Sequence, residues 1–278
     1  MKNMPFVKLD NGVKMWYEIH GREEGNNLLL YHGWGASTAF WSEQIPLLAE
    51  MGYRVISLDS RGHGKSDKPR KGYSLEQLRR DFVIFQKELN LDSWAVIGHS
   101  AGGGVAQVTY HDYPDQTKAL VLIDTSYTIV KTFEQKLFWN MLPTPLTITL
   151  TPLLRWSLRT ISNMSVPFIA SVMNKPRDTV KAWIRDLNAV PNYVIIEEIK
   201  QIVNYNLEEK LEAIKVPTCL ICGNLDTITP LSMMREMQVR IPDSRLCVIK
   251  NAGHFALITQ SEQVNHCLKL FLEEKYPA

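Results

Sequence analysis

The chain has 278 residues, of which 45% are hydrophobic and 22% charged, and 31 Lys and Arg residues nearly balance 29 Asp and Glu. This composition is typical of a globular protein with a sizeable core, and it excludes a disordered or fibrous chain. The formal net charge of +2 gives no strong basic field, so we expect no nucleic-acid partner.

The four cysteines all lie in the last quarter of the chain, whereas a disulfide framework usually spreads through a small secreted protein. Cys219 and Cys222 have C-x-x-C spacing, but they lie in an apolar run that predicts a strand, where their side chains point to opposite faces. We interpret both as core cysteines in a reducing compartment. Residues 1–10 lack the apolar segment of a signal peptide, which predicts a cytoplasmic protein.

The predicted elements begin with an antiparallel hairpin over Phe6–Ile19, which turns at Asp10-Asn11-Gly12. Apolar runs that predict buried parallel strands then alternate with helical patterns. These runs are Leu28–Tyr31, Arg54–Leu58, Trp94–Ile97 and Ala119–Ile123. A capping box at Ser74-Leu-Glu-Gln77 predicts the start of one of the helices.

The strand pattern stops after Asp124 for roughly ninety residues of mainly helical sequence. It resumes with strands at Pro217–Gly223 and Arg245–Ile249, and the chain ends in an amphipathic helix over Gln260–Glu274. A helical insertion at this place should lie over the carboxyl edge of the sheet, where ligands bind. The apolar stretch Leu137–Leu154 within it is interrupted by prolines, so we expect a broken helix in a lid and no stable membrane insertion.

A G-x-S-x-G sequence, Gly98-His-Ser100-Ala-Gly102, joins one of these buried strands to a helical pattern. Flanking glycines allow a sharp strand-to-helix turn that exposes the serine above the sheet, next to the positive end of the helix. A serine needs a base to accept its proton and an acid to orient that base. Asp226 follows the predicted strand Pro217–Gly223 and His254 follows Arg245–Ile249, in the chain order Ser, acid, His. Asp124, at another strand end, is the alternative acid.

On these residues the chain resembles the α/β-hydrolase fold superfamily over nearly its full length. Further matching pieces are His32-Gly-Trp-Gly35, Asp59-Ser-Arg-Gly-His63-Gly-Lys-Ser-Asp67 and Gly253-His254. The resemblance implies an α/β fold with a mostly parallel eight-stranded sheet flanked by helices and a helical cap inserted after strand 6. The expected core is residues 1–126 and 214–278, with the cap at residues 127–213.

By the same resemblance, Ser100 is the nucleophile, His254 the general base and acid, and Asp226 its orienting partner. The backbone N–H groups of Trp34 and Ala101 would form the oxyanion hole. The predicted substrate-binding residues are Trp34, His99, Phe138, Trp139 and Met141, although His99 also fits a packing role beside the turn. We interpret His32 as shaping the oxyanion loop, and His63, Asp59 and Arg61 as a network that braces the loop behind the site. No group has metal-ligand spacing, and no cofactor is expected.

The inserted segment is polarised in charge, with mainly basic residues from Lys131 to Arg185 and mainly acidic ones from Asp186 to Glu212. Its basic half is compatible with contact to a lipid surface or an acyl carrier, and a solvated outer face is the plainer interpretation. We expect a monomer or homodimer.

The sequence predicts a serine hydrolase of the carboxylesterase type, acting on esters of short to medium apolar acyl groups. Close relatives in fold that open epoxides or displace halide carry Asp at the position of Ser100, so acyl chemistry is favoured. The alternatives are a lactonase, for example on acyl-homoserine lactones, and a hydrolase of carbon–carbon bonds. A further alternative is a slow-turnover receptor or partner-binding protein on this fold.

Overall fold

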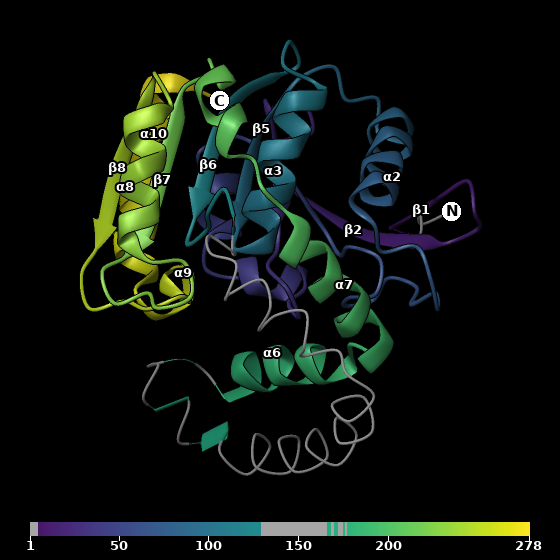
Figure 1. Ribbon diagram of the computed structural model, residues 1–278. Helices are drawn as coiled ribbons and strands as arrows, with labels where there is room; N and C mark the ends of the chain where they lie inside the picture. Colours follow the sequence, from purple (N-terminus) through teal and green to yellow (C-terminus); the bar gives the residue numbers. More distant parts are fainter. Residues whose placement is uncertain (1–4, 129–165, 168–169, 172–174, 176) are drawn as a thin grey trace.

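The computed structural model describes residues 5–128, 166–167, 170–171, 175 and 177–278. Along this part of the chain, three consecutive strands come first, and helices then separate the later strands (Figure 1). The strands are β1 (Phe6–Lys8), β2 (Lys14–Gly21), β3 (Asn27–Tyr31), β4 (Arg54–Leu58), β5 (Trp94–His99), β6 (Thr117–Ile123), β7 (Thr218–Gly223) and β8 (Ser244–Ile249). The helices are η1 (Thr38–Trp41), α1 (Ile45–Glu50), α2 (Leu75–Glu88), α3 (Ala101–Asp112), α6 (Arg177–Ala189), α7 (Asn192–Asn204), η2 (Glu208–Ala213), α8 (Leu231–Arg240), α9 (Ala256–Thr259) and α10 (Ser261–Lys275).

The strands form one sheet in the order β1-β2-β4-β3-β5-β6-β7-β8. The strands β1 and β2 pair with each other antiparallel, as the hairpin pattern predicts, and β2 also pairs antiparallel with β4. All other pairs, from β4 through β8, are parallel. The predicted α/β architecture with a mostly parallel sheet is therefore confirmed.

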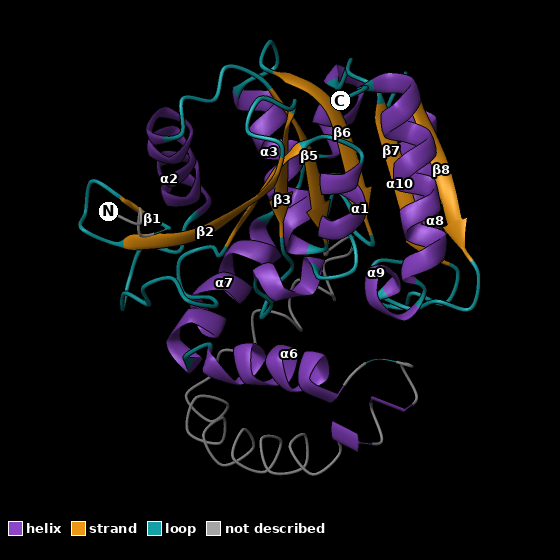
Figure 2. Cartoon of the chain, turned by 180° about the vertical axis from the view of Figure 1, so that it is seen from behind, coloured by secondary structure: helices purple, strands orange, loops and turns teal. Residues whose placement is uncertain are grey.

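Helices cover both faces of the sheet (Figure 2). One hydrophobic cluster joins one face to α2, α3 and α8, and a second joins the other face to α1 and α10. All six residues of β5 are buried, because side chains of a central strand enter both clusters in turn. Each fully buried aliphatic side chain contributes about 1.5–3 kcal/mol, so this two-sided core holds the strand ends in fixed positions.

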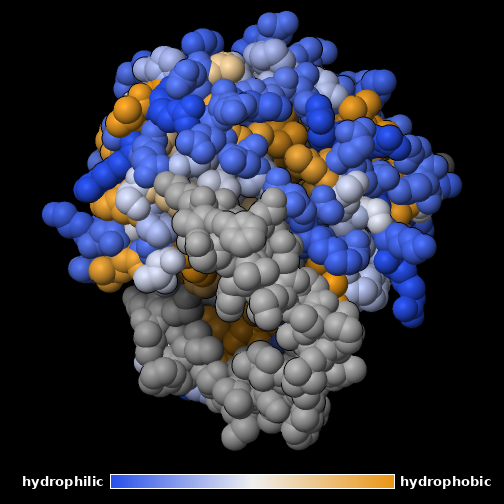
Figure 3. Space-filling view, viewed as in Figure 1, coloured by the Kyte–Doolittle hydropathy of each residue, from blue (hydrophilic) through white to orange (hydrophobic). Residues whose placement is uncertain are grey.

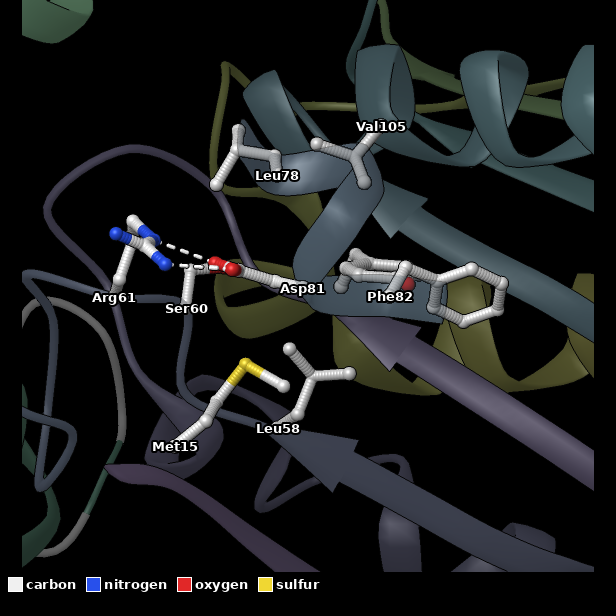
Figure 4. Close-up of a pocket in the computed structure, with 9 residues that line it drawn as sticks. Met15, Leu58, Ser60, Arg61, Leu78, Asp81, Phe82 and Val105 are labelled. Carbon is white, nitrogen blue, oxygen red and sulfur yellow. Dashed lines mark hydrogen bonds and ion pairs between the residues drawn. The ribbon is translucent and has the colours of Figure 1, made fainter. Parts of the chain in front are cut away.

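The helix α2 begins where the capping box predicts. The Ser74 side chain accepts a hydrogen bond from the Gln77 backbone N–H at 3.2 Å. The Gln77 side chain does not return to the cap but donates to Asp81 at 3.0 Å. Asp81 in turn forms a buried, two-bonded ion pair with Arg61, with N–O distances of 2.5 Å. Figure 4 shows this pair at the side of a small cavity of about 20 Å³, room for about one water molecule.

Between β6 and β7 the described residues include α6 and α7, which lie past the end of the sheet toward which the β6 and β8 arrows point (Figure 1). Hydrogen bonds tie these helices to the core. Ser37 donates to Asp186 at 2.6 Å, the Trp183 indole donates to the Ala39 carbonyl at 3.0 Å, and Tyr193 donates to the Lys68 carbonyl at 2.6 Å. The predicted boundaries of the cap, residues 127–213, stay a prediction, since much of that span lies outside the described residues.

One pair of cysteines differs from the reduced state that the expected reducing compartment implies. Cys247 on β8 and Cys267 on α10 form a disulfide, with a Cα–Cα distance of 6.5 Å. The sequence showed no sign of this pair because a strand and a helix twenty residues apart meet only through tertiary packing. Cys219 and Cys222 are free, buried, and in opposite clusters, as their i,i+3 spacing in a strand predicts. Burial raises the pKa of Cys219 to about 11, so its thiol stays protonated at neutral pH.

The described surface in Figure 3 is mostly hydrophilic, with hydrophobic residues in separate small groups. None of the helices within the described ranges combines the length and the apolar character that crossing a bilayer requires. The apolar stretch Leu137–Leu154 lies outside the described residues.

Candidate active site

The turn between β5 and α3 holds Ser100 in a left-handed conformation, with φ of 53° and ψ of −121°. A non-glycine residue adopts such a conformation only where its surroundings enforce it. The flanking glycines are required by space: a Cβ on Gly98 would overlap the Gly102 backbone, and one on Gly102 would overlap the Tyr31 carbonyl. The G-x-S-x-G pattern therefore reflects close packing of the turn against β3, with the serine side chain directed out of it.

The structure brings Ser100, His254 and Asp226 into one hydrogen-bonded row. The Ser100 hydroxyl lies 2.8 Å from His254 Nε2, and His254 Nδ1 lies 2.9 Å from Asp226 Oδ2. These residues come from the loops after β5, β7 and β8, three parallel strands that end at the same carboxyl edge of the sheet. Because Asp226 accepts at Nδ1, the imidazole carries its proton there and leaves Nε2 free to accept the serine proton.

Asp226 is held by its own loop. Its Oδ1 accepts from the backbone N–H groups of Ile228 and Thr229 at 2.8 and 3.0 Å, and its Oδ2 accepts from the Thr229 hydroxyl at 2.7 Å. Burial alone would raise the pKa of Asp226, but the His254 ring and the Thr229 hydrogen bonds outweigh it and hold the pKa below its usual value. The acid is thus ionised beside His254. Thr229 was not predicted as a site residue from the sequence, although an Asp followed three residues later by Thr is typical of such a turn.

The predicted oxyanion donors are the backbone N–H groups of Ala101 and Trp34. Ala101 is the first residue of α3, where the amide has no acceptor within the helix. Trp34 lies in the loop after β3, and neighbouring side chains brace this loop. His63 Nε2 accepts from the Gly35 N–H at 3.1 Å, and Asp59 Oδ1 accepts from the Thr38 N–H at 2.6 Å. Fixed donors of this kind need no reorganisation when negative charge develops beside them.

The histidines around the site have structural contacts. His32 Nδ1 lies 2.8 Å from the Gly33 carbonyl, and its Nε2 accepts from the Ser60 N–H at 3.1 Å, which agrees with a loop-shaping role. His63 is buried, and burial followed by the neighbouring His32 lowers its pKa to about 3. Its ring is therefore neutral and can accept from Gly35. This agrees with the predicted brace behind the site, to which Arg61 contributes its carbonyl, 3.2 Å from His63 Nδ1.

His99 is 2% exposed and lies beneath the base. Its Nε2 is 2.8 Å from the His254 carbonyl, and burial lowers its pKa to about 3, so the neutral ring donates to that carbonyl. This placement favours the packing role of His99 over substrate contact. The Trp34 side chain is 42% exposed and open to a ligand. The other predicted substrate-binding residues, Phe138, Trp139 and Met141, lie outside the described residues.

A further acid, Glu198 on α7, was not foreseen from the sequence. Burial raises its pKa to about 8, partly offset by a hydrogen bond from the Trp34 side chain. Its Oε2 lies 3.6 Å from His63 Nε2, the atom that already accepts from Gly35. Two acceptors facing each other favour the protonated carboxyl, so Glu198 joins α7 to the Trp34 loop as a neutral acid.

One cluster near the row has the donor types of a metal site. Ligand atoms of Asp124, Cys222 and Asp226 lie within 4.8 Å of one another. The carboxylates are already engaged, Asp226 by His254 and Thr229 and Asp124 by two backbone amides. Burial also raises the pKa of Cys222 to about 12, which disfavours the thiolate a metal requires. The arrangement therefore fits two carboxylates that are each hydrogen-bonded to other groups better than a cation site.

Comparison with known proteins identifies the family to which this fold belongs. The model of the alpha/beta hydrolase fold family matches residues 26–261. A non-heme haloperoxidase of Rhodococcus erythropolis is 28% identical, over 97% of this chain and all of its own. Among solved structures, an esterase from Exiguobacterium antarcticum has a TM-score of 0.79 at 22% identity, covering 96% of this chain and 98% of its own. The enol-lactonase from Burkholderia xenovorans LB400 has a TM-score of 0.80 at 20% identity, covering 97% of this chain and 100% of its own. The chain belongs to the alpha/beta hydrolase fold family.

Proposed function

We propose that the protein is a serine hydrolase of the carboxylesterase type that cleaves esters of short to medium apolar acyl groups. The observation that carries this proposal is the row of Ser100, His254 and Asp226, with distances of 2.8 and 2.9 Å. A serine hydroxyl is a weak nucleophile by itself, and this row supplies both a base and the acid that orients it.

In the proposed reaction, Ser100 Oγ attacks the ester carbonyl carbon while His254 Nε2 takes the hydroxyl proton. The negative charge on the carbonyl oxygen is stabilised by the N–H groups of Trp34 and Ala101. The protonated His254 then gives its proton to the leaving alcohol as the carbon–oxygen bond breaks, which leaves an acyl group on Ser100. Water repeats the sequence with His254 as base, releases the acid and restores the free serine.

Three features support the acyl chemistry and the orientation of the base. The residue at the turn between β5 and α3 is Ser100 and not an aspartate, so the covalent intermediate is an ester of the serine. Asp226 is ionised and hydrogen-bonded at His254 Nδ1, so it stabilises the imidazolium that forms during attack. The His99 hydrogen bond to the His254 carbonyl holds the backbone of the base in place.

A lactone is the second candidate substrate, because its carbonyl can be attacked by the same row with the alcohol retained in the product. A panel of p-nitrophenyl esters of increasing chain length, with lactones and ring-cleavage products of the vinylogous diketone class alongside, separates the candidates. The proposal predicts the highest kcat/KM on short to medium acyl esters, and no turnover of any ester would contradict it. Covalent labelling by a serine-directed phosphonate without steady turnover would favour the receptor alternative.

A further inference from the structure

The end of β6 contacts the turn between β5 and α3, which carries Ser100. The Ser100 backbone N–H donates to the Ile123 carbonyl at 3.0 Å, and the Thr125 hydroxyl donates to the Ser100 carbonyl at 2.7 Å. Both peptide groups of the strained serine are therefore held by the residues on either side of Asp124. Together with the Gly103 N–H, which donates to the Ser100 carbonyl at 2.9 Å from the start of α3, these contacts from the neighbouring strand enforce the positive φ of Ser100.

The Asp124 carboxylate contacts the other two loops of the row. Its Oδ1 accepts from the Gly223 N–H at 2.8 Å, three residues before Asp226. Its Oδ2 accepts from the Ala256 N–H at 3.1 Å, two residues after His254. Asp124 is itself fully buried and adopts a positive φ of 43°, which for a non-glycine residue requires firm support from its surroundings. One side chain thus joins the backbone of the acid loop to the backbone of the base loop.

Resting on the proposed function, we infer that Asp124 is a positioning residue that fixes the Asp226 loop and the His254 loop relative to each other and to Ser100. It does not take part in proton transfer, because His254 Nδ1 is 2.9 Å from Asp226, while both Asp124 oxygens accept hydrogen bonds from backbone N–H groups. A carboxylate suits this place since it presents two acceptors to two N–H groups. Asparagine would keep one acceptor and oppose the second N–H with its own donor.

The charged and titratable groups that face Asp124 are Asp226, His254 and Cys222. Burial, helped by the charge of Asp226, raises the pKa of Asp124 to about 7, against the lowering effect of the two amides. Protonation near neutral pH converts one of its acceptors into a donor. The hydrogen bonds to Gly223 and Ala256 should then weaken together, which gives a signature specific to this carboxyl.

The test compares Asp124→Asn with Asp92→Asn, an exposed aspartate in the turn before β5, as the matched control. We expect Asp124→Asn to lower kcat on a p-nitrophenyl ester about 10- to 100-fold, the range for a small displacement of reacting groups, with KM within about twofold. Asp92→Asn should behave as wild type. A kcat of Asp124→Asn within twofold of wild type, or a loss confined to KM, would overturn the inference. So would Asp226→Asn retaining activity while Asp124→Asn has none, since Asp124 would then be the acid.

A second measurement uses the wild-type protein and so does not depend on whether a variant folds. In the wild-type protein, the backbone amide resonances of Gly223 and Ala256 should move between pH 5 and 9 with one shared midpoint near 7, because both donate to the same carboxyl. Two different midpoints, or movement of only one of the two resonances, would overturn the inference. Failure of the proposed function is recognised separately: wild type would then neither turn over an ester nor be labelled at Ser100 by a phosphonate, whatever the amides do.

Discussion

Replacing Glu198 by glutamine tests whether α7 meets the Trp34 loop through a neutral acid. The side chain is 16% exposed, and burial raises its pKa from 4.5 to about 8. A carboxyl whose pKa is raised on folding favours the folded state when protonated, so its contribution is lost as pH rises from the unfolded to the folded value. With pKa values of 4.5 in the unfolded chain and about 8 in the folded protein, the Glu198 carboxyl lowers the free energy of unfolding by about 2–3 kcal/mol as the pH rises from 6 to 9.

The assay is urea unfolding of wild type and Glu198→Gln at pH 6 and pH 9. Asp124 titrates in both proteins, so the difference between them isolates Glu198. We expect wild type to lose about 2–3 kcal/mol relative to Glu198→Gln over this range. His63 is neutral in the fold but titrates in the unfolded chain of both proteins, so its contribution cancels in the difference. Glu197→Gln, whose partly exposed side chain pairs with Lys200, is the control and should show no such difference. A pH-independent difference for Glu198→Gln would refute the buried neutral acid.

The other predictions concern the cysteines, the acid and a helix cap. Thiol titration of the unfolded, unreduced protein should find two free thiols, and four would contradict the Cys247–Cys267 disulfide. Reduction of this disulfide should lower the free energy of unfolding by about 3 kcal/mol. Asp226→Asn should lower kcat on the order of 10⁴-fold because His254 loses the partner that fixes its tautomer, and a loss under tenfold in steady-state assays would contradict that role. Ser74→Ala should cost about 1 kcal/mol by urea unfolding through the lost cap of α2, and no change would mean that the cap bond is not formed.

The layout of the fold could be predicted from the sequence because local patterns and tertiary packing agree. The apolar run Arg54–Leu58 is the strand β4 without a change of bounds, and the cap at Ser74 starts α2. The juxtaposition of the loops after β5, β7 and β8 also follows from sequence, since parallel strands in one sheet end at the same edge. Motif spacing could therefore place Ser100 and His254 near each other before any coordinates were known.

Contacts that depend on how one element docks against another could not be predicted. The approach of Glu198 to His63 depends on where α7 lies over the core, and nothing local to either residue indicates it. The Cys247–Cys267 bond depends on the packing of α10 against β8. Asp124 was weighed only as an alternative acid, because a strand-end position does not show which backbone amides its carboxylate will reach.

The central claim is that Ser100 is a nucleophile activated by His254. The most direct measurement is the intact mass of the protein after treatment with a serine-directed fluorophosphonate, with the modified residue located by peptide mapping. We expect one adduct per chain on Ser100 in wild type and none in Ser100→Ala, together with a fall in ester turnover on the order of 10⁴ to 10⁶. An adduct on another residue, or ester turnover in Ser100→Ala close to that of wild type, would contradict the account.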